Sequence, residues 1–79
     1  MTVLDRVREI LQLRGGEASL REVYDDMERL HGIVMTRGRQ AGIRKEIERH
    51  SSHSALWDGF RPDVFYTVAG IGRGLWGLR

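Results

Sequence analysis

Length, composition and charge describe one small folded domain. Its 79 residues suit a modest core, since a domain of this size buries only about 60% of the surface of its unfolded chain, and 41% apolar with 30% charged residues exclude a disordered or fibrous chain. The lack of cysteine excludes disulfides and thiolate metal sites, and no stretch reaches the roughly 18 apolar residues of a membrane span. The N-terminus does not have the form of a signal peptide, so we expect a soluble protein of the cytoplasm.

The net charge is only +2, but the basic residues gather in the second part of the chain. Residues 1–30 hold five basic and seven acidic side chains, whereas residues 31–79 hold eight basic and four acidic ones. Twelve of the thirteen basic residues are arginine, which makes forked contacts with phosphates and guanine edges. A GC-rich genome would produce the same preference for arginine, so position along the chain matters more than the count.

Two amphipathic helices are expected first. Thr2 can cap a helix whose apolar residues recur at spacings of three and four and which stops at Gly15-Gly16. Ser19-Leu-Arg-Glu22 is a capping box, in which the serine hydroxyl accepts a backbone N–H and the glutamate reaches back to the cap. The helix behind this box should end at Gly32. The expected core residues are Val3, Leu4, Val7, Ile10 and Leu11 in the first helix, and Leu20, Val23, Tyr24, Met27 and Leu30 in the second.

A third helix is expected over residues 37–50. Its inward stripe is thin, with little more than Ile43 and Ile47, so most of its circumference faces something other than the core. Gly38 and Gly42 lie inside this helix, where each costs about 1 kcal/mol relative to alanine. Such residues indicate a purpose other than helix stability.

Beyond a polar connector at residues 51–62, two apolar segments predict a β-hairpin. Residues 63–68 are β-branched and aromatic, and residues 75–78 can pair with them across the glycine-rich turn 69–74. Three short helices followed by a hairpin are the order of a winged helix-turn-helix domain, in which the third helix enters the major groove of DNA and the hairpin forms the wing. We therefore predict an α+β fold of this type over residues 1–79, as one module of a larger protein.

The outward face of the third helix is the candidate DNA-binding surface. At about 100° per residue, Ile43 and Ile47 fix the inward direction of the helix. On the opposite side, Gly38 and Ala41 make a flat centre flanked by large basic side chains, which lets the backbone approach a groove while arginines reach base edges or phosphates. Arginines in the first turn also oppose the helix dipole, which favours a bound anion there. The predicted contacts with double-stranded DNA are Thr36, Arg37, Arg39, Gln40, Arg44 and Lys45 from the helix and Arg73 from the hairpin tip.

Two alternatives compete with this interpretation. The charged face can be an ordinary solvated surface on which Glu46 and Glu48 pair with nearby basic residues, with Arg73 as a solubilising loop charge. The chain can also be a protein-interaction domain, which would use an exposed aromatic patch around Trp57 and Phe60. Lack of DNA binding and of any salt dependence would favour the second alternative.

Neither an enzyme nor a metal or cofactor site is expected. Three serines near His50 and His53 place hydroxyls beside a base, but serines after a helix are usually caps and turns, and no third group orients a histidine. Two histidines also fall short of the four ligands that zinc usually takes. The glycines of residues 70–74 lie between strands rather than before a helix, which argues against a nucleotide site. The aromatic side chains of Phe65, Tyr66 and Trp76 are expected mainly in the core.

Four segments carry a family resemblance that covers nearly the whole chain. They are Ser19-Leu-Arg-Glu-Val-Tyr24, Ile43-Arg-Lys-Glu-Ile-Glu-Arg-His-Ser-Ser-His-Ser54, Pro62-Asp-Val-Phe-Tyr66 and, most specific, Gly70-Ile-Gly-Arg-Gly-Leu-Trp-Gly-Leu-Arg79. With these segments the chain resembles winged-helix domains of the HARE-HTH type and related domains of bacterial restriction endonucleases. The resemblance implies a DNA-binding accessory domain that helps to select modified or foreign DNA, for example DNA with modified cytosine, for a nuclease domain in the same parent protein. The aromatic connector at residues 51–62 is longer than a minimal winged helix needs.

Overall fold

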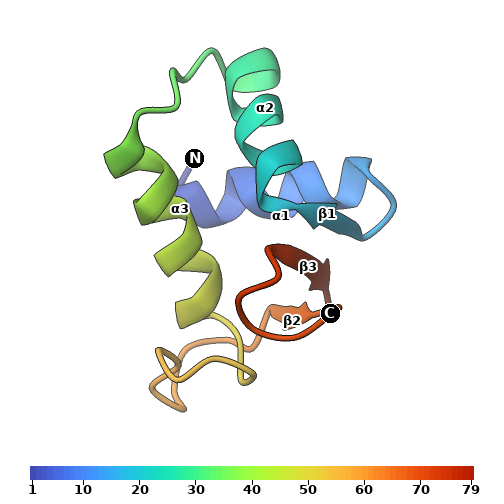
Figure 1. Cartoon of the computed structure of the whole chain (residues 1–79), viewed down its shortest axis with the longest axis vertical. Coiled ribbons are helices and arrows are strands. Elements are labelled where there is room, and N and C mark those ends of the chain that lie inside the picture. The colour runs from blue at the N-terminus through green and yellow to red at the C-terminus, as the bar shows by residue number, and fades with distance from the viewer.

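Three helices and a small antiparallel sheet make up the structure, a computed structural model that describes residues 1–79 (Figure 1). This result confirms the predicted α+β class, with three helices and a C-terminal hairpin. None of the three helices has the length and apolar character that crossing a membrane requires. In chain order the elements are α1 (Val3–Leu13), β1 (Glu17–Ser19), α2 (Leu20–His31), α3 (Arg37–Arg49), β2 (Phe65–Thr67) and β3 (Leu75–Leu78).

Side chains close the N-termini of α1 and α2. Thr2 Oγ1 accepts the N–H of Asp5 at 3.1 Å, and the Asp5 carboxylate accepts the N–H of Thr2 at 3.1 Å. Ser19 and Glu22 form the same reciprocal pair at 3.1 and 2.9 Å, which confirms the predicted capping box. Gly32 ends α2 in the left-handed conformation, with φ 64°, as predicted. Local sequence therefore decides where α1 begins and where α2 begins and ends.

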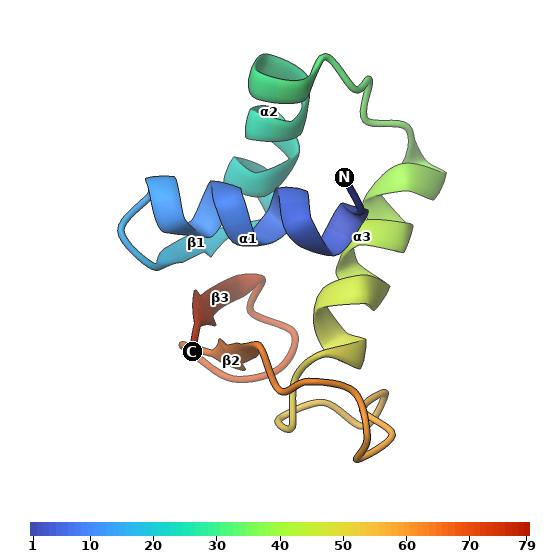
Figure 2. The ribbon, with the colours of Figure 1, turned by 180° about the vertical axis from the view of Figure 1, so that it is seen from behind.

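The strand β1 was not predicted, and it connects the hairpin to the helices. It pairs antiparallel with β3 on the side away from β2, giving the strand order β1-β3-β2. Leu20, the first residue of α2, also donates its N–H to the carbonyl of Gly74 at 2.7 Å. Seen from behind, α1 crosses between α2 and the hairpin, with α3 beside them (Figure 2). The C-terminal hairpin is therefore held by hydrogen bonds to the segment that starts α2.

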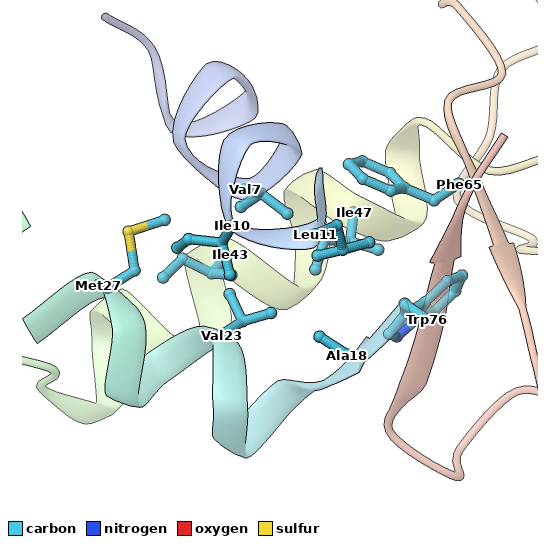
Figure 3. Packing of buried hydrophobic residues seen from close by; sticks show 10 residues of the cluster. All are labelled: Val7, Ile10, Leu11, Ala18, Val23, Met27, Ile43, Ile47, Phe65 and Trp76. Atoms are coloured by element: carbon cyan, nitrogen blue, oxygen red, sulfur yellow. The ribbon is translucent and has the colours of Figure 1, made fainter. Parts of the chain in front are cut away.

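The core fills the space between the helices and the sheet, and its side chains converge from all three helices, β1 and the hairpin (Figure 3). Phe65 and Trp76 are 0% and 4% exposed, which confirms their predicted place in the core, whereas Tyr66, also predicted there, is only half-buried. Val3 and Leu30, also predicted there, are 45% and 41% exposed, because they lie at the ends of their helices. The ten buried apolar residues are Val7, Ile10, Leu11, Ala18, Val23, Met27, Ile43, Ile47, Phe65 and Trp76.

Gly77 lies in the middle of β3 beneath the half-buried ring of Tyr66. A Cβ at this position would overlap the Tyr66 ring, which belongs to its registered partner on β2. The Tyr66 hydroxyl reaches across to β1 and donates to the Glu17 carboxylate at 3.2 Å. The missing side chain therefore lets one tyrosine span all three strands.

Asp26 on α2 is a buried carboxylate that the sequence analysis did not single out. Its side chain is 2% exposed and accepts two hydrogen bonds from Arg14, from Nε at 2.6 Å and Nη2 at 2.9 Å, and one from Arg29 Nη2 at 3.0 Å. The same Arg14 guanidinium contacts Glu22 at 2.7 Å. Hydrogen bonds from Arg14, and then from Arg29, hold the pKa of Asp26 below its usual value despite its burial. This network links the end of α1 to the middle of α2.

The two ends of the connector between α3 and β2 meet at the carbonyl group of His50. His50 O accepts the N–H groups of Val64 at 2.7 Å and Phe65 at 3.0 Å. At the far tip of the loop, the carboxylate of Asp58 accepts two backbone N–H groups at 2.8 and 2.9 Å. Residues 51–64 are therefore an ordered loop that returns to the end of α3.

Candidate nucleic-acid interface

The helix α3 stands at one side of the molecule, and its inward side is fixed in two ways (Figure 1). Ile43 and Ile47 are 5% and 1% exposed and pack in the core, as predicted. Tyr24 of α2 donates its hydroxyl to the carbonyl of Gln40 at 3.2 Å, which fixes the first half of α3 against α2. The opposite side of α3 is open to solvent and is not covered by the connector.

Three of the predicted contact residues, Arg37, Arg44 and Lys45, are exposed on α3 and unpaired. None of them forms an ion pair or a side-chain hydrogen bond within the chain. Glu46 approaches only a histidine, at 3.5 Å, and Glu48 forms no ion pair at all. The ion pairs expected for an ordinary solvated face are therefore not formed. The arginines that do form ion pairs lie elsewhere in the fold, and they are Arg14, Arg29, Arg61 and Arg79.

No contact or backbone angle within the chain requires glycine at positions 38 and 42. A Cβ added to either residue would meet no atom within 4 Å, and neither has a positive φ angle. Alanine would fit at both positions and would favour the helix by about 1 kcal/mol each. On the exposed side, Gly38 and the half-buried Ala41 leave a flat strip of backbone between the basic side chains. An external surface can approach the helix closely along this strip.

The N-terminus of α3 carries positive charge and no acidic residue in its first turn. Thr36 caps the helix with a single hydrogen bond, since its Oγ1 accepts the N–H of Arg39 at 3.2 Å and no carboxylate returns the contact. The first turns of α1 and α2, by contrast, contain Asp5 and Glu22. The positive end of the α3 dipole therefore faces solvent together with Arg37, an arrangement that favours a bound anion.

Two of the predicted contacts, Arg39 and Gln40, are directed away from this face. The Arg39 guanidinium donates to the carbonyl of Val34 at 2.8 Å. Gln40 Nε2 lies 3.4 Å from the carbonyl of Met35. Both side chains therefore hold the linker between α2 and α3 against the start of α3. The structure does not bring them together with Arg44 and Lys45.

A cleft of about 400 Å³ lies between α3 and the hairpin tip. Arg44 and Glu48 line it from α3, and Ile71, Gly72 and Gly74 line it from the tip. Arg73 is exposed on this tip, in a turn closed by its N–H to the carbonyl of Gly70 at 3.3 Å. Arg44 also lies near Tyr24 of α2. Burial raises the pKa of Tyr24, and the positive charge of Arg44 opposes this rise. The tip that carries Arg73 therefore borders the same cleft as Arg44.

The aromatic patch of the alternative interpretation is also exposed. Phe60 is 94% exposed in the connector, and Leu56, which precedes Trp57 in the sequence, is 48% exposed. Trp57 is half-buried and donates Nε1–H to the carbonyl of Arg61 at 2.9 Å. This result confirms the predicted partial exposure of Trp57 and Phe60. The patch sits on an ordered loop and not on a free segment.

The serines and histidines after α3 act as turn and bridging residues. Ser51 Oγ and Ser54 Oγ accept backbone N–H groups two residues further on, at 3.2 and 3.1 Å. His53 Nδ1 accepts the N–H of Thr67 at 3.1 Å, and Arg79 Nη2 lies 3.3 Å from its Nε2. The contacts of His53 attach the connector to β2 and to Arg79, the residue after β3.

The chain is a small α+β domain in which α3 carries unpaired basic side chains on its exposed side and the hairpin tip carries the exposed Arg73. Comparison with protein-family models, with curated proteins and with solved structures yields no match.

Proposed function

We propose that this chain is a winged helix-turn-helix domain that binds double-stranded DNA, with α3 in the major groove and the β2–β3 hairpin as the wing. The observation that carries the proposal is the unpaired set Arg37, Arg44 and Lys45 on the exposed side of α3. Gly38 adds to it, because its Cβ position is open space and the backbone there can approach a groove. A helix of about 10–12 Å diameter fits a major groove about 12 Å wide.

Each basic residue has a distinct role in this proposal. Arg44 and Lys45, about two turns into α3, reach base edges or the flanking phosphates. Arg37 and the free N–H groups behind Thr36 bind a phosphate at the N-terminus of the helix. Arg73 contacts the backbone or the minor groove from the hairpin tip, whose residues Ile71, Gly72 and Gly74 line the same cleft as Arg44.

We further propose that the domain serves a restriction system, as the DNA-binding part of a larger protein with a nuclease domain. The resemblance of Gly70–Arg79 and the three other segments to winged-helix domains of restriction endonucleases supports this proposal. In it, the chain supplies affinity for DNA, modified or unmodified, and the nuclease domain cuts.

Titration of a short labelled duplex at two salt concentrations tests DNA binding. Binding should weaken steeply with salt, because each neutralised phosphate releases counterions. Arg37→Ala and Arg44→Ala should each weaken binding by about 1–3 kcal/mol where the side chain reads a base edge, and by less, with a smaller salt slope, where it contacts phosphate. Arg8→Ala is the matched control, since Arg8 is exposed on α1 and forms no ion pair. Unchanged duplex affinity in both α3 variants would exclude the exposed side of α3 as the DNA-binding surface.

The exposure of Phe60 supports a second candidate function, a protein-interaction domain. An aromatic side chain that is 94% exposed on an ordered loop is pre-organised to enter a pocket of a partner protein. Phe60→Ser should leave duplex affinity unchanged if α3 binds DNA. Absence of duplex binding at low salt, with loss of a partner in the Phe60→Ser variant, would favour this second function.

A further inference from the structure

A hollow of about 550 Å³ lies on the flank of α3 away from the hairpin cleft. The start of α1, the linker at residues 32–36 and α3 surround it, and six of its ten lining residues are apolar. Figure 1 shows the N-terminus of the chain beside α3, beneath the arch of this linker, and Figure 2 shows the same arrangement from behind. Its volume is within the range of about 300–1,000 Å³ that small-molecule sites occupy.

The walls of this hollow are unusually adaptable. All three methionines of the chain, Met1, Met27 and Met35, line it. Methionine side chains are flexible and polarizable, and they adjust to ligands of different shape. Gly42 contributes bare helix backbone, because a Cβ there would meet no atom within 4 Å. The hollow therefore offers an apolar surface that no side chain of the protein fills.

The charged side chains around the hollow are mainly basic, and neither arginine is paired with a carboxylate. Arg6 forms no ion pair and no side-chain hydrogen bond. Arg39 forms no ion pair, and its guanidinium donates one hydrogen bond, to the carbonyl of Val34. Glu46 is the one carboxylate in the lining, and it lies 3.5 Å from His50 Nδ1. Two guanidinium groups against one carboxylate favour a ligand with a negative charge.

We propose that this hollow binds a small amphiphilic carboxylate, with its apolar chain against the methionines and Gly42 and its carboxylate at Arg6 and Arg39. Arginine presents a planar fork that matches a carboxylate, whereas an amine would be repelled by both side chains. This site is separate from the exposed side of α3 that carries Arg37, Arg44 and Lys45. It does not depend on whether that side binds DNA.

Nuclear magnetic resonance of the protein with ¹³C-methyl methionine tests the proposal directly, because every methionine signal comes from the hollow. The probes are octanoate, octanol and octylamine, which share one apolar chain and differ in charge. Octanoate should shift the methionine signals saturably and bind about three- to tenfold more tightly than octanol, with octylamine weakest. Equal binding of all three, or no saturable shift, would overturn the proposal.

Four variants separate the apolar and charged parts of the site. Gly42→Leu should fill the hollow and abolish octanoate binding, whereas Gly42→Ala favours the helix in the same way but should retain most of it. The double variant Arg6→Gln with Arg39→Gln should bind octanoate and octanol equally, and Arg8→Gln, which lies outside the hollow, should keep the preference for octanoate. Circular dichroism checks that each variant is folded. Undiminished octanoate binding by folded Gly42→Leu, or an unchanged preference in the double variant, would refute the assignment.

Discussion

The helices α2 and α3 have similar lengths, 12 and 13 residues, but they use their polar residues in opposite ways. In α2 the polar residues hold the fold, since Ser19 and Glu22 close its N-terminus and Asp26 is held by two arginines. In α3 the basic residues of the exposed side pair with nothing. Gly38 also leaves that side bare where alanine would fit.

This difference separates residues that stabilise the protein from residues that are available to a ligand. Ser19, Glu22 and Asp26 are satisfied within the chain, so a partner would gain little by contacting them. Arg37, Arg44 and Lys45 of α3 keep their full hydrogen-bonding capacity, while Gly38 and the positive charge in the first turn lower the intrinsic stability of this helix. Substitutions that remove internal contacts of α2, or that change the N-cap or the exposed side of α3, test this contrast.

The largest effect is expected when α2 loses its buried carboxylate. Asp26→Ala should lower the free energy of unfolding by about 2–4 kcal/mol, because Arg14 and Arg29 lose their common partner and a buried hydrogen-bonded site is left empty. Chemical denaturation measures the change. Asp25→Ala is the control, since Asp25 is exposed and unpaired, and it should stay within about 0.5 kcal/mol of the unaltered protein. Equal effects of the two substitutions would contradict the stabilising role of the network.

The same carboxylate predicts a dependence of stability on pH. The pKa of Asp26 in the folded protein is lower than the value of about 3.9 expected in the unfolded chain. Its contribution is therefore complete above about pH 4 and is lost as the pH falls through the folded-state pKa. Four other carboxylates also have lowered pKa values and act in the same direction, namely Asp5, Glu22, Asp58 and Asp63. To isolate Asp26, the free energy of unfolding of the unaltered protein is compared with that of Asp26→Asn at each pH. The difference between the two should shrink on acidification.

A smaller effect is expected when the N-cap of α2 or of α3 is removed. Ser19→Ala removes one partner of a reciprocal capping box and should cost about 1–2 kcal/mol of unfolding free energy. Thr36→Ala removes a single hydrogen bond and should cost about 1 kcal/mol or less. Thermal unfolding of the two variants gives the comparison. A larger loss for Thr36→Ala would mean that α3 depends on its cap more than α2 does.

The smallest change in stability, and one of opposite sign, is expected at Gly38. Gly38→Ala and Gly38→Leu should both raise the free energy of unfolding by up to about 1 kcal/mol, because the position is open and both residues favour a helix. Duplex affinity should fall much more with leucine than with alanine, since only leucine fills the flat strip. Equal duplex affinity of the two variants would show that this strip does not contact DNA.

The parts of the fold that the sequence predicts are those decided by neighbouring residues. The local signals place helix ends and faces correctly. The ends of α2 follow from the Ser19–Glu22 capping box and Gly32, and the inward face of α3 follows from the spacing of Ile43 and Ile47. The strand β1 has only three residues, and it is a strand because Glu17–Ser19 meets Leu75–Gly77. No local periodicity could reveal that pairing.

The candidate site was predictable to a similar extent. The exposed positions of Arg37, Arg44 and Lys45 follow from the helical period once the two isoleucines are placed inward. The direction of Arg39 does not follow, because it depends on the path of the linker and the carbonyl of Val34. The role of Asp26 depends on Arg14, twelve residues earlier, which no helical spacing connects to it.

The carbonyl of His50, which receives both Val64 and Phe65, makes the connector a closed side loop. Because the loop leaves and returns at this carbonyl, insertions or deletions at its tip, near Gly59, should leave the strand register unchanged. Related chains could differ widely in length here while keeping one scaffold. The same property makes the loop a suitable place to graft a fluorescent label or a foreign peptide.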